Sequence, residues 1–182
     1  MGTIFVDNLE PQSGTSLTLG ASGDTLQAAS GTTNLLSKII QYKIIRAETQ
    51  FDTSSNSLAE MDTNLRTTIT PTNASNKIVI KFNCAWIDNY SAGVESVLTF
   101  YRSINGGSYS NISTDESNQA DLFYNWSGDR FQIARAFTYI DADHNTTNSV
   151  IYTPYGRSTS GSQSRFGTSD RFSSMEVMEI AT

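Results

Sequence analysis

The sequence predicts an all-β chain: an antiparallel, jelly-roll-like β-sandwich preceded by a short repetitive N-terminal β arm. Three observations favour this fold class. The 182 residues include 25 serines, 22 threonines and 14 asparagines, types that disfavour helix interiors. Apolar and polar residues alternate in several separate segments, which is the period of a half-buried strand. Glycine and proline turn signals separate these segments.

Composition also excludes several classes of function. Lys and Arg total 12 against 18 Asp and Glu, a formal net charge of −6, which disfavours nucleic acid and anionic membrane surfaces as partners. No apolar run approaches the roughly 20 residues that span a bilayer. The N-terminus shows no secretory signal, and the single cysteine, Cys84, excludes an internal disulfide. We therefore expect a protein made in a cytoplasm, with no membrane insertion and no nucleic-acid partner.

Residues 1–34 are predicted to form an anchor and an oligomeric shaft. A Ser-Gly unit followed by small polar residues and a leucine recurs there, beginning at Ser13, Ser22 and Ser30. One such strandlet buries too little apolar surface to offset the entropy of ordering it, so association of several copies is favoured over a flexible linker. The leucines expected in that shared core are Leu17, Leu19, Leu26 and Leu35. The apolar residues Ile4, Phe5 and Val6 are the candidate attachment site of this anchor.

Residues 38–182 are predicted to form the β-sandwich head. The clearest strand is 77–87, in which apolar residues occupy every even position: Ile78, Ile80, Phe82, Cys84 and Trp86. This parity places Trp86 in the core rather than on a ligand platform. It makes Cys84 a small buried hydrophobe rather than a nucleophile.

Further strands are predicted over 39–51, 65–69, 94–102, 130–140, 150–157 and 174–181. Asn105-Gly106-Gly107 predicts a hairpin turn. Pro154 suggests that its strand lies at a sheet edge. The segment 174–181 carries apolar side chains on both faces, which indicates either a central strand or one pressed against another subunit.

Three strings resemble small tail-fibre-like structural proteins of tailed bacteriophages, especially marine ones. They are the leader from Val6 to Leu26, the link from Ile69 to Ile78 and the ending from Met175 to Ala181. The resemblance implies a homotrimeric virion appendage with an N-terminal anchor and a distal jelly-roll head for host-surface adsorption. Its partners would be copies of itself and other virion proteins of the tail, or of the capsid if it is a decoration or head fibre. The protein would be made in the host bacterial cytoplasm and end in the virion.

Signatures of catalysis are weak. His144, the single histidine, lies in Asp141-Ala142-Asp143-His144-Asn145, which fits either a divalent-metal site or a solvated turn between strands. The turn is favoured because no second histidine is available. No nucleophile elbow and no phosphate-binding glycine loop is found in the sequence. We expect no enzymatic activity, cofactor or metal, with a carbohydrate-binding module or weak hydrolase as the alternative.

An aromatic run at 123–130 offers a candidate glycan site. Flat rings stack on the apolar faces of sugars, and planar polar groups bind their hydroxyls. The predicted contacts for a host-surface polysaccharide are Tyr124, Asn125, Trp126, Asp129 and Arg130. The alternative is a strand edge packed on the sandwich or on a neighbouring subunit. The Ser/Gly-rich segment 155–167 is interpreted either as a recognition loop or as a connection with no role.

Overall fold

The computed structural model describes residues 39–112, 121–124, 130–159 and 161–181, with only the backbone described for 121–124. The chain divides between Ser37 and Lys38 into two units, and all of the described residues belong to the second unit. The predicted anchor and shaft lie outside the described residues, including Ile4, Phe5, Val6, Leu17, Leu19, Leu26 and Leu35.

The described residues are mostly β-strand. The strands are β1 (Ile39–Thr53), β2 (Ala59–Glu60), β3 (Thr67–Ile69), β4 (Lys77–Asn89), β5 (Glu95–Ile104), β6 (Ser110–Asn111), β7 (Asp121–Tyr124), β8 (Phe131–Asp141), β9 (Val150–Ser158) and β10 (Ser164–Ile180). One short 3₁₀ turn, η1 (Thr63–Leu65), separates β2 from β3. Within this part of the chain, no helix has the length and apolar character needed to cross a membrane.

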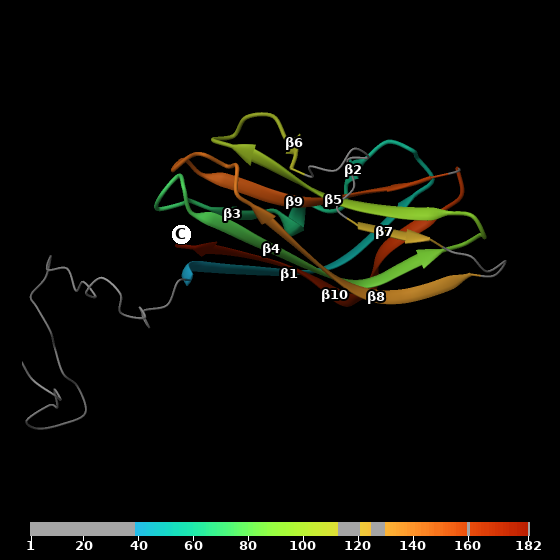
Figure 1. The fold of residues 1–182 in the computed structure, drawn as a ribbon. Helices are drawn as coiled ribbons and strands as arrows, with labels where there is room; N and C mark the ends of the chain where they lie inside the picture. The colour runs from blue at the N-terminus through green and yellow to red at the C-terminus, as the bar shows by residue number, and fades with distance from the viewer. Residues whose placement is uncertain (1–38, 113–120, 125–129, 160, 182) are drawn as a thin grey trace, which may run out of the picture. The chain divides into compact units, whose positions relative to one another are not determined.

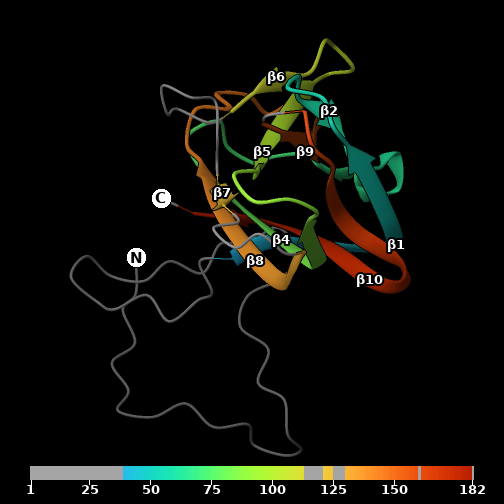
Figure 2. The ribbon, with the colours of Figure 1, turned by 90° about the vertical axis from the view of Figure 1, so that its right-hand side faces the viewer.

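The strands form two antiparallel sheets that lie face to face, as Figures 1 and 2 show from two directions. The first sheet has the order β1-β10-β4-β8. The second has the order β2-β9-β5-β6, with β3 also pairing with β9 and β7 with β5. Each sheet buries one face against the other, which is the two-layer solution for strands with one apolar face.

The pairing confirms the predicted jelly roll. The first strand pairs with the last, β1 with β10, and the short segments β2 and β3 pair with β9. Strand β4 pairs with β8, and β5 pairs with β6 and β7. Strands from the two ends of the described chain pair with each other, and the strands between them pair in turn. The resulting antiparallel ribbon folds over into two sheets, which is the arrangement of a jelly roll.

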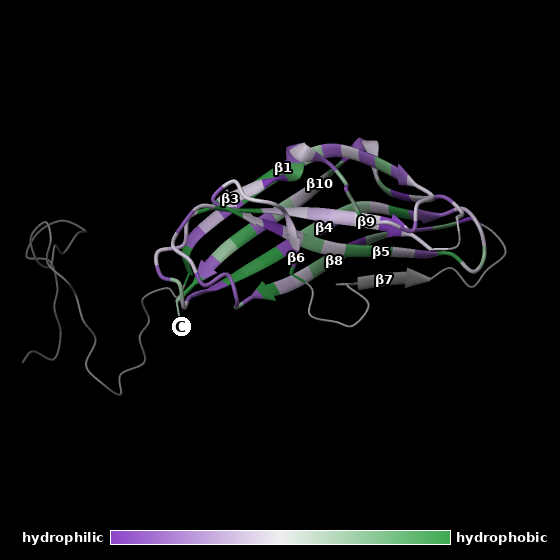
Figure 3. Cartoon of the chain, turned by 90° about the horizontal axis from the view of Figure 1, so that it is seen from above, coloured by the Kyte–Doolittle hydropathy of each residue, from purple (hydrophilic) through white to green (hydrophobic). Residues whose placement is uncertain are grey.

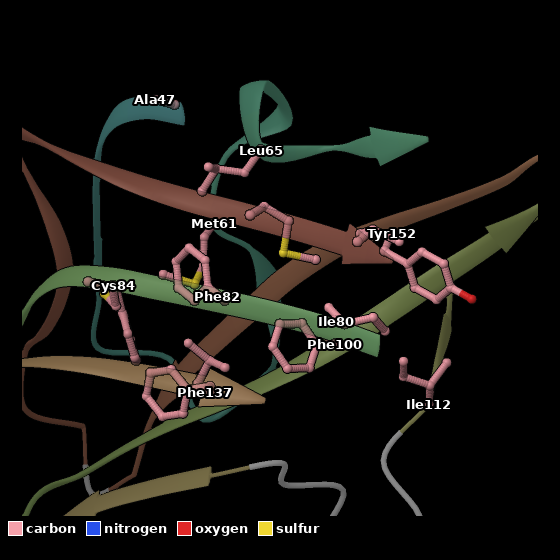
Figure 4. Close-up of a cluster of buried hydrophobic side chains, with 14 of the residues drawn as sticks. Ala47, Met61, Leu65, Ile80, Phe82, Cys84, Phe100, Ile112, Phe137 and Tyr152 are labelled. Carbon is pink, nitrogen blue, oxygen red and sulfur yellow. The ribbon is translucent and has the colours of Figure 1, made fainter. Parts of the chain in front are cut away.

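The core lies between the sheets and comes from the alternating inward positions of their strands. Ile80, Phe82, Met175, Phe100 and Tyr152 are all at most 1% exposed. Figure 4 shows several of these side chains meeting between the layers. The polar and apolar bands that alternate along the strands in Figure 3 are the same periodicity that the sequence displays.

Strand β4 follows the predicted parity only as far as Cys84. Ile78, Ile80, Phe82 and Cys84 are buried, as predicted. A register shift then falls between Cys84 and Ile87, so Ile87 is 1% exposed. Trp86 is only half-buried, so its prediction as a core residue is wrong. A bulge inserts one residue into a strand and moves every later side chain to the opposite face.

Strand β9 is not the edge strand that Pro154 suggested. It lies between β5 and the segments β2 and β3. Pro154 is tolerated because it faces the interruption between those two segments, where its carbonyl oxygen accepts from the Met61 backbone N–H at 3.0 Å. The only ladder bond lost is the reciprocal one from residue 154 to the Met61 carbonyl, at the end of β2 where the pairing already stops.

Most of the predicted loop 155–167 is strand. Strand β9 extends to Ser158 and β10 begins at Ser164, and both of these serines are fully buried. The Ser164 hydroxyl donates to Ser158 Oγ at 3.0 Å. Small hydroxyl side chains pack into this end of the sandwich, so most of the segment is not the adaptable loop that its composition suggested. The predicted hairpin turn is confirmed, with Asn105 and Gly106 at φ of 51° and 72°.

Candidate functional site

An apolar row crosses the outer face of the first sheet. Strand register places Tyr42 of β1 beside Met178 of β10, Met178 beside Val79 of β4, and Val79 beside Ile140 of β8. Tyr42 is 49% exposed and Ile140 is 54% exposed. We call these four residues the outer apolar row. Soluble proteins seldom leave such a continuous apolar band open to water unless it binds something.

The rows on either side of this row mix charged, polar and apolar residues. The adjacent row along the strands contains Glu176 and Lys81, which face each other across β10 and β4. On the other side Ile180 pairs with both Ile39 and Lys77. Exposed apolar side chains interspersed with charged ones on one sheet face are typical of a protein–protein contact.

The position of β10 in the sheet explains why its sequence is apolar on both faces. It lies centrally between β1 and β4, which confirms the first of the two predicted alternatives. Met175 and Val177 point inward and are fully buried, whereas Met178 and Ile180 lie on the outer face and are half-buried. The inner pair belongs to the core, and the outer pair belongs to the open surface.

The predicted glycan residues are only partly within the described structure. Asn125, Trp126 and Asp129 lie outside it. Tyr124 belongs to β7, where its backbone pairs with Glu95. Arg130, which is described, binds Asp88 through its Nε atom at 3.0 and 2.7 Å.

The Arg130–Asp88 pair is anchored in the sheet and reaches the surface. Asp88 is fully buried while the Arg130 side chain is 46% exposed. Burial opposes ionisation of Asp88, but hydrogen bonds from Arg130 and Gln132 outweigh it and lower the Asp88 pKa. The Arg130 guanidinium carbon also lies 4.6 Å from the ring centre of Tyr90.

Arg130 lines a small depression that the sequence did not reveal. The depression holds about 170 Å³, and its walls come from β4, the start of β8, and β10. Its lining residues are Trp86, Arg130, Gln132, Arg165, Thr168, Asp170 and Arg171. We call it the Trp86 depression. The structure thus brings Arg130 together with Trp86 in one surface hollow.

Coincident bulges create this hollow. Register shifts occur in β1 between Glu48 and Gln50 and in β4 between Cys84 and Ile87, while β10 is irregular over 166–174. Three adjacent strands therefore lose regular pairing at the same level of the sheet. Bulges re-aim side chains and gather beside functional sites, and here they turn Trp86 outward.

Gly167 makes the irregular part of β10 possible. Its φ is +73°, and a Cβ added to it would lie 2.0 Å from the Thr49 carbonyl oxygen of β1. We predict that Gly167→Ala destabilises the head by about 2 kcal/mol or more, because both the left-handed backbone and the collision oppose a side chain. Thermal unfolding measures this loss.

Gly106→Ala is the matched control for that prediction. Gly106 has a similar φ of +72° but nothing within 4 Å of an added Cβ. Gly106→Ala should lower the free energy of unfolding by only about 1 kcal/mol. Equal losses at the two glycines would show that the contact between β1 and β10 at Thr49 imposes no constraint.

The charges around the Trp86 depression are largely compensated. Arg130 is paired with Asp88, and Arg165 donates to Asp52 at 2.7 Å. A hydrogen bond from Thr168 lowers the pKa of Asp170, and the nearby positive charge of Arg171 contributes to the same shift. The hollow therefore presents many hydrogen-bonding groups with little net charge.

A wider depression of about 330 Å³ lies on the same sheet, lined by residues that include Cys84, Arg135 and Phe172. Burial raises the pKa of the Cys84 thiol to about 11. The thiol therefore stays protonated near neutral pH and acts as the buried hydrophobe that the sequence predicted.

His144 lies in a turn between β8 and β9, as predicted, but it is not solvated. It is 2% exposed, and its Nε2 and Nδ1 atoms lie 2.7 and 3.1 Å from the carbonyl oxygens of Asn76 and Thr146. The neighbouring Asp141 accepts from Arg102 at 2.6 Å and from the Tyr152 hydroxyl at 2.8 Å. In the described residues no three His, Cys, Asp or Glu side chains gather as a metal site.

Glu179 joins two strings that the sequence singled out separately. This β10 residue is fully buried. Its carboxylate accepts at 2.7 Å from the Thr72 backbone N–H and hydroxyl, at 2.6 Å from Asn76 Nδ2 and at 2.7 Å from Gln41 Nε2. The link 69–78 and the ending 175–181 thus meet at one carboxylate. Burial alone would raise its pKa, but these hydrogen bonds together lower it.

Stability is therefore expected to fall in acid. The folded-state pKa values of Glu179 and Asp88 lie below their ordinary values of 4.5 and 3.8. Their ionised forms stabilise the fold at pH values above those ordinary pKa values. This contribution is lost as pH falls through the lowered folded-state values. We predict a flat free energy of unfolding from about pH 7 to 5 and a decline below about pH 4, measured by urea unfolding. An unchanged urea midpoint at pH 3 would contradict the sign of both shifts.

No protein family and no curated protein matches the sequence. Among solved structures, the chain is similar to a chain in the structure of the infectious bursal disease virus Gt strain. The two have 12% sequence identity and a TM-score of 0.45, over 88% of this chain and 43% of that chain. The structure of the Gx strain has 12% identity and a TM-score of 0.41, over 77% of this chain and 32% of that chain. The VP2 subviral particle of the same virus has 10% identity and a TM-score of 0.39, over 88% of this chain and 43% of that chain. This chain spans less than half the length of these structures.

Proposed function

We propose that the protein is a non-enzymatic structural protein of a virion, a short homotrimeric appendage of a tailed phage. Residues 1–34 anchor it and form its shaft, and the jelly-roll head contacts the host surface. The protein is made in the host bacterial cytoplasm and acts in the virion. The resemblance of three sequence strings to tail-fibre-like proteins supports this assignment.

The outer apolar row is the observation that carries the proposal. Two of its side chains are about half exposed in a single copy of the chain, and burying apolar surface is the main favourable contribution to association. The row begins on β1, the first strand after the arm. Three copies related by one axis would bury three such rows.

Deletion of residues 2–34 tests the anchor. The truncated chain should stay folded but fail to enter virus particles when it replaces the full chain during infection. Particle incorporation is measured by immunoblot of purified virions, and folding by circular dichroism of the truncated chain. Normal incorporation without the arm would contradict the proposed attachment.

A further inference from the structure

The Trp86 depression combines an aromatic ring with polar groups from three strands. Trp86 is half-buried on β4, and the guanidinium carbon of Arg171 lies 5.0 Å from its ring centre. The ring is therefore held at the surface instead of completing the core. A large aromatic side chain that gives up core burial at a coincidence of bulges suits contact with a ligand.

Hydrogen-bonding groups surround the ring. Arg130 binds Asp88 through Nε and one terminal nitrogen, which leaves its other terminal nitrogen outside that pair. Arg165 likewise binds Asp52 through Nε and one terminal nitrogen. A guanidinium offers five N–H donors in a plane, so each arginine can hold its carboxylate and still donate to a ligand. Asp170 supplies an exposed acceptor on the same wall.

Charge and size restrict the ligand. Two of the three arginines are paired with carboxylates, and the whole chain carries −6. An acidic polymer would therefore gain little attraction in the hollow and would be repelled by the chain as a whole. A volume of about 170 Å³ lies below the roughly 300–1,000 Å³ of pockets for drug-sized ligands, so one small ring fits better than an extended molecule.

We propose that the Trp86 depression binds one ring of a neutral saccharide on the host surface. The ring's apolar face stacks on Trp86, and its hydroxyls hydrogen-bond to Arg130, Arg165 and Asp170. This inference rests on the proposed function, because it names the ligand class that the head of such an appendage would adsorb to. It differs from the sequence-predicted glycan patch in using Trp86, with Arg130 common to both.

Single-ring sugars test the site by NMR on the full chain. The protein has two tryptophans, so the Trp86 indole N–H signal is assigned by its loss in Trp86→Phe. Glucose, galactose, mannose and N-acetylglucosamine are titrated to about 50 mM, since single rings bind in the millimolar range. At least one should shift the Trp86 indole signal saturably. Glucuronate, which adds a carboxylate to the glucose ring, should bind at least about tenfold more weakly than glucose if glucose is the sugar that binds.

Substitutions locate the binding. Trp86→Ala and Asp170→Ala should each weaken binding of the responding sugar at least about tenfold, because one removes the stacking ring and the other a charged acceptor, measured by saturation-transfer NMR. Phe172→Ala is the matched control, because Phe172 is also an exposed aromatic with an arginine over its ring (Arg46, at 4.8 Å) but lies outside the depression. Asp170 is exposed, so its variant tests the site even if Trp86→Ala fails to fold.

The inference is overturned if none of the four sugars shifts the Trp86 indole signal, if glucuronate binds more tightly than glucose, or if Phe172→Ala weakens binding as much as Asp170→Ala. Sugar binding and trimer assembly are measured separately, so one can fail without the other. A trimer that binds no sugar defeats only the ligand assignment. A monomer that binds sugar at Trp86 defeats only the assembly.

Discussion

Replacing Tyr42 and Ile140 together by lysine is expected to dissociate the proposed trimer into single chains. Both side chains lie at the ends of the outer apolar row and are about half exposed in one copy. In the assembly they would be buried, and lysines there would have to lose their hydration without any partner. Light scattering should show the mass falling from about 60 kDa, three times 19.9 kDa, to that of one chain.

Thr68→Lys with Asn148→Lys is the control for this experiment. Thr68 and Asn148 are both exposed, Thr68 on β3 of the second sheet and Asn148 in the connection between β8 and β9. The double variant changes the net charge by the same amount. It should remain trimeric. If the Tyr42 and Ile140 variant stays at about 60 kDa, the outer apolar row is not the contact between copies.

Glu179→Ala is expected to be among the most destabilising single substitutions in the head. The carboxylate is fully buried, and the substitution would leave the Thr72 N–H and the Asn76 amide without their acceptor. Hydrogen bonds to a charged group contribute about 1.5–3 kcal/mol each, and buried donors left unsatisfied are costly. We expect a loss of about 3 kcal/mol or more, which corresponds to a fall of roughly 6–12 °C in Tm for a domain of this size.

Glu48→Ala provides the comparison. Glu48 is an exposed glutamate on β1, and its removal should change stability by no more than about 0.5 kcal/mol. Glu179→Gln keeps the size of the side chain but loses the charge, so it should also reduce the decline in stability below about pH 4. A Glu179→Ala protein as stable as Glu48→Ala would show that the 69–78 link does not depend on this carboxylate.

The fold could be predicted because its strands have a local sequence signal. The alternation from Ile78 to Cys84 matches their burial residue by residue. The two apolar faces of 174–181 indicated either a central strand or one pressed against another subunit, and the strand is central in its sheet. These signals depend only on the two-residue period of a strand with one face in the core. Pairing partners are not local, so the outer apolar row emerges only when register places Tyr42, Met178, Val79 and Ile140 side by side.

The Trp86 depression could not be predicted because its origin is a set of bulges. Parity placed Trp86 inside, and the one local sign of a break was that Trp86 and Ile87 are adjacent apolar residues. Gly167, which permits the matching irregularity in β10, is 81 residues after Trp86 in the chain. The role of Glu179 was equally hidden, since its partners lie more than 100 residues away.

The mass of the unmodified full chain in solution shows whether three copies assemble. Multi-angle light scattering should give about 60 kDa, three times the 19.9 kDa of one chain, and the value should persist on dilution to low micromolar concentration. A mass of 19.9 kDa under these conditions would contradict the account, because the outer apolar row would then be exposed in the working form of the protein.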